Sequence, residues 1–487
     1  MTADTHNPHH ARRWWILAIL GIAQLMVVLD ATVVNIALPS AQESLAFSDD
    51  NRQWIITAYA LAFGSLLLIG GRIGDLFGRR QVFIGGLLGF AVASAIGGAA
   101  QSFGVLVAAR GLQGVFGALL APAALSLLTT TFTSPGERGK AFGIFGAVAG
   151  AGGAVGLLLG GVLTEYLSWR WAMYVNLFFA IPAALGALAL IRSQAHPDRP
   201  RLDIPGTITA SAGLFAIVYG FSQAETRGWG DGVTVAFLAA GVALLVAFVW
   251  LQTRVAAPLV PLRVILDRNR GTSYLAMGIA GAGMFGVFLF LTYYLQRTLG
   301  FSPVTTGLAF LPLAGAVMVS ATTATAMLVP RFGPRPLVTL GMGLAAVGMV
   351  LLAQLGVDSA YASDVLPALI LMGSGMGLIF APGMAIGTLG VAAHDAGIAS
   401  ALLNVGQQVG GSLGTALLST LSASAVASFA AGKAATPAVA EQAAVHGFTT
   451  AFWWAAGIFA VGAIVSAAMF RSGAPEVEPG AEPVLAH

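Results

Sequence analysis

Residues 53–100 read QWIITAYALAFGSLLLIGGRIGDLFGRRQVFIGGLLGFAVASAIGGAA, two apolar runs on either side of a short turn that holds three arginines. Each run is close to the roughly 20 apolar residues that a helix needs to cross the hydrocarbon core of a bilayer. Arginines in a tight turn between two such runs are typical of a loop that stays on one side of a membrane. The stretch therefore predicts a pair of transmembrane helices, over 53–71 and 82–100.

The composition of the whole chain agrees with a membrane location. Of the 487 residues, 57% are hydrophobic and only 9% are charged, whereas a soluble protein carries roughly a quarter charged residues. The 63 glycines suit helices that pack closely in lipid. Cysteine is absent, which excludes disulfides, thiolate metal sites and a cysteine nucleophile. The net charge of +3 is not gathered in one stripe, so nucleic-acid binding is not expected.

The same pattern of apolar runs recurs along the chain and predicts an all-α polytopic membrane protein with fourteen transmembrane helices. The expected spans lie near residues 14–38, 53–71, 82–100, 104–130, 140–164, 170–192, 205–223, 233–253, 272–296, 303–329, 336–354, 364–388, 397–425 and 448–470.

The positive charges predict how these spans are oriented. With fourteen spans and a cytoplasmic N-terminus, 17 basic residues fall on the cytoplasmic side and 5 on the other side. Those on the cytoplasmic side are Arg12, Arg13, Arg72, Arg79, Arg80, Arg138, Lys140, Arg192, Arg199, Arg201, Arg254, Arg263, Arg268, Arg270, Arg331, Arg335 and Arg471. Those on the other side are Arg52, Arg170, Arg227, Arg297 and Lys433. This asymmetry favours an even span count with both termini in the cytoplasm.

The chain is expected to divide into two six-helix bundles with two additional helices between them. The expected segments are a cytoplasmic tail (1–13), an N-terminal bundle (14–192), a cytoplasmic loop (193–204), the two additional helices (205–253), a second cytoplasmic loop (254–271), a C-terminal bundle (272–470) and a cytoplasmic tail (471–487). The first apolar run continues to Leu38 without a small-residue cleavage pattern before Asp30, so signal-peptide cleavage is not expected.

Two ionisable residues, Asp30 and Arg110, lie within predicted spans, where a charge is costly and therefore informative. At 1.5 Å per residue, Asp30 lies about 24 Å along its outward helix and Arg110 about 9 Å below the outer face. In a core of about 30 Å both are at a similar depth. They can form a salt bridge that only makes both charges insertable, or Asp30 can exchange protons while Arg110 adjusts its proton affinity. We favour the second interpretation.

No other chemistry is expected within the spans. All seven histidines lie in tails or loops, which argues against a histidine proton relay and against a metal site. We find no polar cluster fit for catalysis, so we expect no enzyme activity and no cofactor. Glu165 ends a span at the outer surface and is expected to be a solvated cap or to line an outer vestibule.

Several motifs resemble the major facilitator superfamily, and in particular its fourteen-span drug:proton antiporters of the QacA and EmrB type. The resemblance covers about residues 12–470. It rests on Leu29 to Pro39 in the first span, the turn from Gly71 to Arg80, the fourth-span motif Arg110, Gln113 and Gly114, the glycines from Gly146 to Gly161, the stretch from Trp169 to Asn176, and Asn404 to Gln408. It implies two bundles around a midplane site.

The turn motif implies a conformational latch on the cytoplasmic side. Its residues are Gly71, Asp75, Gly78, Arg79 and Arg80. A related Phe-Gly-x-Arg turn occurs 255 residues later, from Ala326 to Arg335, but has Pro330 in place of Asp75. Only the first turn can therefore form an acidic latch, and the alternative is that both are plain topology anchors.

The fifth span is expected to present a smooth face for helix packing, formed by Gly146, Gly150, Gly153, Gly156, Gly160 and Gly161. The resemblance implies an antiporter motif here. However, the chain has Gly156-Leu157 where the family has Gly-Pro, so the proline kink is not expected. Gln407 likewise replaces a common arginine.

The resemblance implies proton-coupled export of hydrophobic or amphiphilic drugs or antibiotics, by alternating access, across the inner (plasma) membrane, and we expect the monomer to be functional. The alternative is a proton-coupled symporter or importer of a small metabolite. Because Asp30 is the single acid at depth, neutral or monovalent amphiphiles are favoured over dications as substrates. Candidate cavity residues are Thr32, Asn35, Tyr59, Asn176, Tyr293, Asn404 and Gln408.

Overall fold

The computed structural model describes residues 12–48, 51–132, 135–192, 203–255, 258–391 and 396–473. Throughout these ranges every regular element is helical. The elements are α1 (Arg13–Leu45), α2 (Gln53–Phe77), α3 (Arg79–Gly98), α4 (Phe103–Thr131), α5 (Pro135–Tyr166), α6 (Trp171–Leu190), α7 (Ile204–Arg227), α8 (Gly232–Gln252), α9 (Leu262–Ile265), α10 (Arg268–Tyr293), η3 (Tyr294–Thr298), α11 (Pro303–Ala309), α12 (Leu311–Thr323), η4 (Ala324–Leu328), α13 (Val329–Phe332), α14 (Pro334–Leu352), η5 (Tyr361–Val365), α15 (Leu366–Thr388), α16 (Ala396–Ala430) and α17 (Pro437–Met469).

Twelve helical segments among the described residues are long and apolar enough to cross a membrane. The two predicted spans that fall short of this measure lie in α2 and α5, whose described apolar stretches are Gln53–Leu67 and Val155–Tyr166. Both belong to longer helices, of 25 and 32 residues. The all-helical architecture predicted from the sequence is therefore confirmed, and the described residues give twelve candidate spans.

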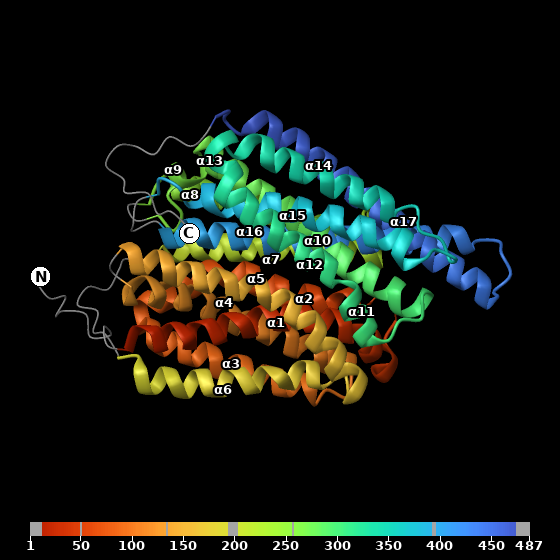
Figure 1. Cartoon of the computed structure of the whole chain (residues 1–487), viewed down its shortest axis with the longest axis horizontal. Coiled ribbons are helices and arrows are strands. Elements are labelled where there is room, and N and C mark those ends of the chain that lie inside the picture. The colour runs from red at the N-terminus through yellow and green to blue at the C-terminus, as the bar shows by residue number, and fades with distance from the viewer. Residues whose placement is uncertain are drawn as a thin grey trace, which may run out of the picture.

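Several predicted boundaries are wrong. Helix α1 continues to Leu45 instead of ending near 38, and α17 begins at Pro437 instead of near 448. The early start of α17 has a local cause, because the Thr436 hydroxyl accepts a hydrogen bond from the Val439 N–H (3.3 Å) and caps an alanine-rich stretch. As a result α16 and α17 form a helical hairpin that extends past the other helices, at the right of Figure 1.

Other segments also depart from the expected spans. The predicted span 303–329 is divided into α11, α12 and a π-helical turn, with Pro312 in the first turn of α12, where the missing N–H costs no hydrogen bond. The loop predicted over 254–271 contains the short helix α9, and α10 already begins at Arg268, where Asp267 caps it. Polar loop composition concealed these short helices.

The helices form two halves that lie side by side in Figure 1, with α1–α6 in red to yellow and α10–α17 in green to blue. We call these the N-terminal half and the C-terminal half. Helix α7 packs against both, through α2 on one side and α16 on the other, and α8 packs mainly on α7. Helix α7 is thus positioned at the boundary between the halves.

The two ends of the bundle differ in character. Helix α1 begins and α2 ends at the end that carries Arg13, Arg80, Arg268 and Arg335, which we call the basic end. The opposite end, where α1 ends and α11 begins, we call the gate end. One hydrophobic cluster crosses from α1 to α10 and α11 near the gate end, and includes Ile36, Leu38, Phe290 and Phe310. The halves are therefore packed together at the gate end.

Candidate functional site

Asp30 lies on α1 with no solvent exposure and accepts hydrogen bonds from three side chains. Nη1 of Arg110 is 2.6 Å from its Oδ2 atom. Its Oδ1 atom accepts from Nε2 of Gln113 (2.8 Å) and from Nδ2 of Asn176 (2.7 Å). Helices α4 and α6 thus hold one carboxylate of α1, and Asp30 and Arg110, which the sequence places at a similar depth, form an ion pair.

Arg110 is only 2% exposed and is held on every side. Its Nε donates to the Ile55 carbonyl (3.1 Å) and its Nη1 also donates to Oε1 of Gln113 (2.8 Å). The guanidinium carbon lies 4.6 Å from the centre of the Tyr59 ring, a favourable position for a cation over an aromatic face. Gln113 in turn donates to the Ser94 hydroxyl of α3 (2.7 Å). We call Asp30, Ser94, Arg110, Gln113 and Asn176 the Asp30 cluster.

The local sequence of α4 explains why the cluster forms where it does. Arg110 and Gln113 are three residues apart and so lie on one face of the helix. Gly114 follows on the side of α2, where an added Cβ would lie 2.9 Å from the Ala62 Cβ and 3.0 Å from the Phe63 nitrogen. Only glycine at this position lets α2 approach closely enough to place Ile55 and Tyr59 beside the guanidinium.

The glycines of α5 do not all share one face. A Cβ on Gly160 would lie 3.0 Å from the Val33 backbone of α1, and one on Gly156 would strike the Thr32 hydroxyl. Gly161 instead faces the Pro303 carbonyl of α11, and Gly153 has open space beside it. Gly146 and Gly150 lie outside the residues whose side-chain surroundings are described. Gly156 and Gly160 therefore contact α1, while Gly161 contacts the C-terminal half.

The turn between α2 and α3 is described only in part. Gly78 has a φ of +94°, which favours glycine, and it ends α2 and begins α3. Arg80 donates to the Leu188 carbonyl of α6 (3.0 Å), while Arg79 is half-buried beside it. Gly71 faces the Pro122 side chain of α4. The side chain of Asp75 lies outside the described residues, so the predicted latch stays a prediction.

Most of the predicted cavity residues are buried within the halves. Thr32 and Asn35 donate to carbonyls of their own helix, those of Val28 and Ala31, and Tyr59 packs on Arg110. Asn176 belongs to the Asp30 cluster. On α16, Asn404 is exposed and Gln408 is half-buried near Gly64 of α2. Asn404 is thus the predicted cavity residue with the most accessible side chain.

Tyr293 lies at the gate end and joins the two halves. Its hydroxyl donates to Oε1 of Gln42 on α1 (2.6 Å), and Nε2 of Gln296 donates to the Ile36 carbonyl (3.1 Å). The guanidinium of Arg52, which is 8% exposed, lies 4.4 Å from the Tyr293 ring centre. Sequence reasoning missed Gln42 and Gln296, as it missed Ser94, because common polar residues near helix ends carry no distinctive spacing.

Glu165 adds a further contact across the gate end. Its carboxylate accepts a hydrogen bond from the Val304 N–H of α11 (2.9 Å). The Ser302 hydroxyl and this N–H together lower the pKa of Glu165 below its usual 4.5. The residue predicted to be a solvated cap or part of an outer vestibule therefore caps the first turn of a helix in the opposite half.

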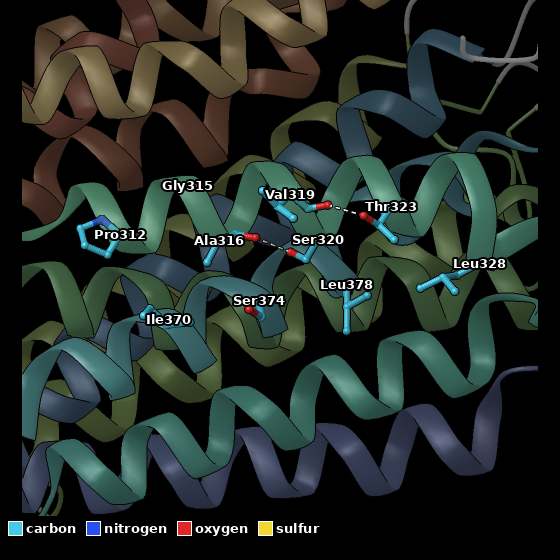
Figure 2. A pocket seen from close by; sticks show the side chains of 10 residues that line it. All are labelled: Pro312, Gly315, Ala316, Val319, Ser320, Thr323, Leu328, Ile370, Ser374 and Leu378. Atoms are coloured by element: carbon cyan, nitrogen blue, oxygen red, sulfur yellow. Dashed lines mark hydrogen bonds between the residues drawn. The ribbon is translucent and has the colours of Figure 1, made fainter.

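A shallow groove between α12 and α15 is lined almost entirely by apolar and hydroxyl side chains (Figure 2). The hydroxyls of Ser320 and Thr323 donate to the Ala316 and Val319 carbonyls one turn earlier, both at 2.7 Å. With these two hydroxyls already engaged, the groove offers a mainly apolar surface and no ionisable group.

Sequence comparisons give a match to one family profile and to relatives of high identity. The sequence profile of the Major Facilitator Superfamily matches residues 20–415. The puromycin resistance protein pur8 of Streptomyces alboniger is 52% identical over 457 residues, covering 93% of this chain and 91% of that protein. The cephamycin export protein CmcT of Amycolatopsis lactamdurans is 41% identical, covering 84% and 85%.

Solved structures share the fold at low sequence identity. The human organic anion transporter MFSD10 superposes with a TM-score of 0.59 at 15% identity, over 93% of this chain and 99% of that one. A bacterial homologue of the human lysosomal transporter Spinster gives a TM-score of 0.62 at 17% identity, over 93% and 96%.

Proposed function

The chain belongs to the Major Facilitator Superfamily, and we propose that it exports an amphiphilic antibiotic in exchange for protons. Relatives named for puromycin resistance, cephamycin export and tetracenomycin C resistance and export are matched over 91%, 85% and 77% of their own lengths. Membership of the family makes the chain a multi-pass membrane transporter and not an enzyme.

The observation that carries the proposal of proton coupling is the buried ion pair of Asp30 and Arg110. Taking a carboxylate out of water costs several kcal/mol even when it is paired. A chain that needed only packing at this position would use an apolar residue. The three hydrogen bonds to Asp30 support a carboxylate that is kept charged in one state and neutralised by a proton in another.

We propose that fourteen helices cross the plasma membrane and that the basic end faces the cytoplasm. Helices α2 and α5, at 25 and 32 residues, exceed the roughly 20 residues required. The excess of arginine at the basic end supports the orientation. The gate end then faces outward, with both termini inside, and the fourteen-span drug:proton antiporters are the subgroup that fits this topology.

Transport would proceed by separating the halves at the gate end while they close at the basic end. The contacts of Tyr293, Gln296 and Glu165 across the halves support a state closed toward the outside. The turn holding Asp75 would then act as the latch in the alternate state. Every element of this cycle lies in one chain, so we propose that the monomer suffices.

The substrate that fits best is a neutral or monovalent amphiphile. Asp30 is the buried acid of the described spans, and Arg110 already neutralises it. Little negative charge is therefore left to attract a dication. The alternative, proton-coupled import of a small metabolite, has the same ion pair but lacks the support of the antibiotic-exporting relatives.

The proposal is tested with purified protein in proteoliposomes, with puromycin as the probe. Liposomes acidic inside should accumulate puromycin in an exchange that raises the internal pH, and Asp30→Asn should abolish the accumulation while leaving downhill exchange of puromycin intact. Acidifying the external side instead distinguishes a symporter, because import with protons would then dominate. Accumulation that is unchanged in Asp30→Asn would contradict proton coupling through this residue.

A further inference from the structure

Asp30 accepts three hydrogen bonds, and this arrangement suits only its ionised form. Two of the donors, Gln113 and Asn176, converge on the same oxygen, Oδ1. A protonated carboxyl group has one O–H donor and needs an acceptor for it. Proton uptake therefore requires that an acceptor replace one of the donors.

Asn176 holds an acceptor that is not in use. Its Oδ1 atom has no hydrogen-bond partner, and the side chain has no solvent exposure, so water does not reach the atom either. The other neutral side-chain acceptors of the cluster each have a partner already, since Oε1 of Gln113 accepts from Arg110 and the Ser94 hydroxyl accepts from Gln113. A buried amide oxygen without a partner is costly and rare, so its presence beside Asp30 calls for an explanation.

We propose that Asn176 is a positioning residue for the proton carried by Asp30, which deepens the proton exchange proposed above and rests on it. Its amide donates to the carboxylate and, after half a turn about the Cβ–Cγ bond, accepts the hydroxyl of the protonated acid. The proton binds Oδ1 of Asp30, while Oδ2 continues to accept from Arg110. The terminal amide torsion is soft and roughly two-fold, so the turn costs little.

The two orientations of the amide are balanced. In the first, Oδ1 of Asn176 is without a partner, and in the second its Nδ2 occupies the same place. Each protonation state of Asp30 therefore leaves one amide atom of Asn176 without a partner. Because this cost is the same in both states, rotation of the amide favours neither of them. Arg110 keeps the Ile55 carbonyl, Gln113 and the Tyr59 ring after Asp30 is neutralised.

The surroundings of Asp30 leave Arg110 as the charged group that faces it among the described residues. Helix α2 contributes the phenol Tyr59 and α3 the hydroxyl Ser94. Helix α5 presents Gly152 and Gly156 to the nearby turns of α1, and the contacts of α1 with the C-terminal half lie at Ile36 and Gln42, near the gate end. Among the described residues no second carboxylate faces Asp30.

The test compares Asn176→Leu with Gln113→Leu, because Gln113 also donates to Asp30 but its amide oxygen is already engaged by Arg110. Loss of a donor destabilises the carboxylate, so protonation occurs at higher pH. For Gln113→Leu we expect the pH of half-maximal puromycin exchange to rise by about one to two units. For Asn176→Leu we expect less than half of that pH shift, because a donor to the carboxylate and an acceptor for the protonated acid are lost together. The maximal rate of puromycin exchange should be about tenfold lower. Asn176→Thr, whose hydroxyl can donate or accept, should recover most of the rate.

A second readout does not depend on transport. In infrared spectra of the purified protein, the acid C=O band of Asp30 is assigned by its absence in Asp30→Asn. It should move to higher wavenumber in Asn176→Leu, because the hydroxyl has lost its acceptor. An unmoved band, or equal pH shifts in the two leucine variants, would overturn the role of Asn176. Absence of proton-coupled exchange in the wild type, with the band still shifted by Asn176→Leu, would instead reject the proposed function alone.

Discussion

The two halves of the molecule differ in what they bury. The N-terminal half encloses an acid, two arginines and several amides, among them Asp30, Arg110 and Asn176. In the described part of the C-terminal half, the buried polar side chains other than tyrosine are serine and threonine. Several of these, such as Thr272, Ser412 and Thr420, donate to a carbonyl one turn earlier and so need no partner from another helix.

The difference suggests a division of labour between the halves. In the proposed exchange, the N-terminal half holds the charge whose protonation would change how its helices are joined. The C-terminal half packs through small residues instead, and a Cβ on Gly281 or Gly414 would strike the partner helix in the α10–α16 contact. In this proposal, proton binding changes the contacts within the N-terminal half, and the C-terminal half moves in response without binding a proton itself.

The largest expected effect comes from unpairing the buried charge in the N-terminal half. Arg110→Met should destabilise the protein by about 3–5 kcal/mol, because Asp30 would remain buried without its cation. Thermal unfolding in detergent measures the effect. The double variant Asp30→Asn with Arg110→Met, in which neither charge remains, should regain much of the loss. A single variant as stable as the double one would show that the ion pair does not stabilise this half.

The close contact of α4 with α2 gives the next largest effect. Gly114→Ala should cost about 1–3 kcal/mol, since the added methyl group meets the α2 backbone and displaces Tyr59 from Arg110. Gly111→Ala on the same helix is a matched control, because it has open space beside it. Unfolding temperatures of the two variants provide the comparison. Equal temperatures would mean that α2 does not need this approach.

The boundary between the halves is tested by two adjacent tyrosines. The Tyr293 hydroxyl binds Gln42 across the halves, whereas the Tyr294 hydroxyl binds the Gly356 carbonyl within one half (2.7 Å). Tyr293→Phe should weaken gate closure by about 0.5–1.5 kcal/mol, and Tyr294→Phe should not affect it. Ala37 is buried in the hydrophobic cluster that crosses the halves near the gate end. Because the chain has no native cysteine, the labelling rate of Ala37→Cys therefore reports opening. A similar increase in the labelling rate in Tyr293→Phe and in Tyr294→Phe would contradict a specific role for Tyr293.

The smallest effect is the pH dependence of the Glu165 contact. The lowered pKa means that the contact with α11 is fully present above the usual carboxyl value of 4.5 and is lost as the pH falls through the lowered pKa. Labelling of Ala37→Cys, divided at each pH by the labelling rate of a free thiol, should therefore stay constant from neutral pH to about 5 and rise in stronger acid. The rise should be absent in Glu165→Gln. A rise that begins at neutral pH would place the responsible group elsewhere.

Some of the site can be predicted from sequence, for definite reasons. Asp30 and Arg110 are identifiable because charges within apolar runs are rare, and their similar depth follows from the helix rise. The contact of Asn176 with Asp30 is not identifiable in this way, because 146 residues separate them and asparagine is common at helix ends. The position of α7 against both halves was equally hidden, since apolar residues face lipid and protein alike.

Proton release by the purified protein tests the central claim most directly. In weakly buffered detergent solution, adding puromycin to the wild type should release protons, because substrate binding and a protonated Asp30 exclude each other. Asp30→Asn should bind puromycin and release none. Equal proton release by the wild type and by Asp30→Asn would contradict the claim that the buried carboxylate of the N-terminal half carries the exchanged proton.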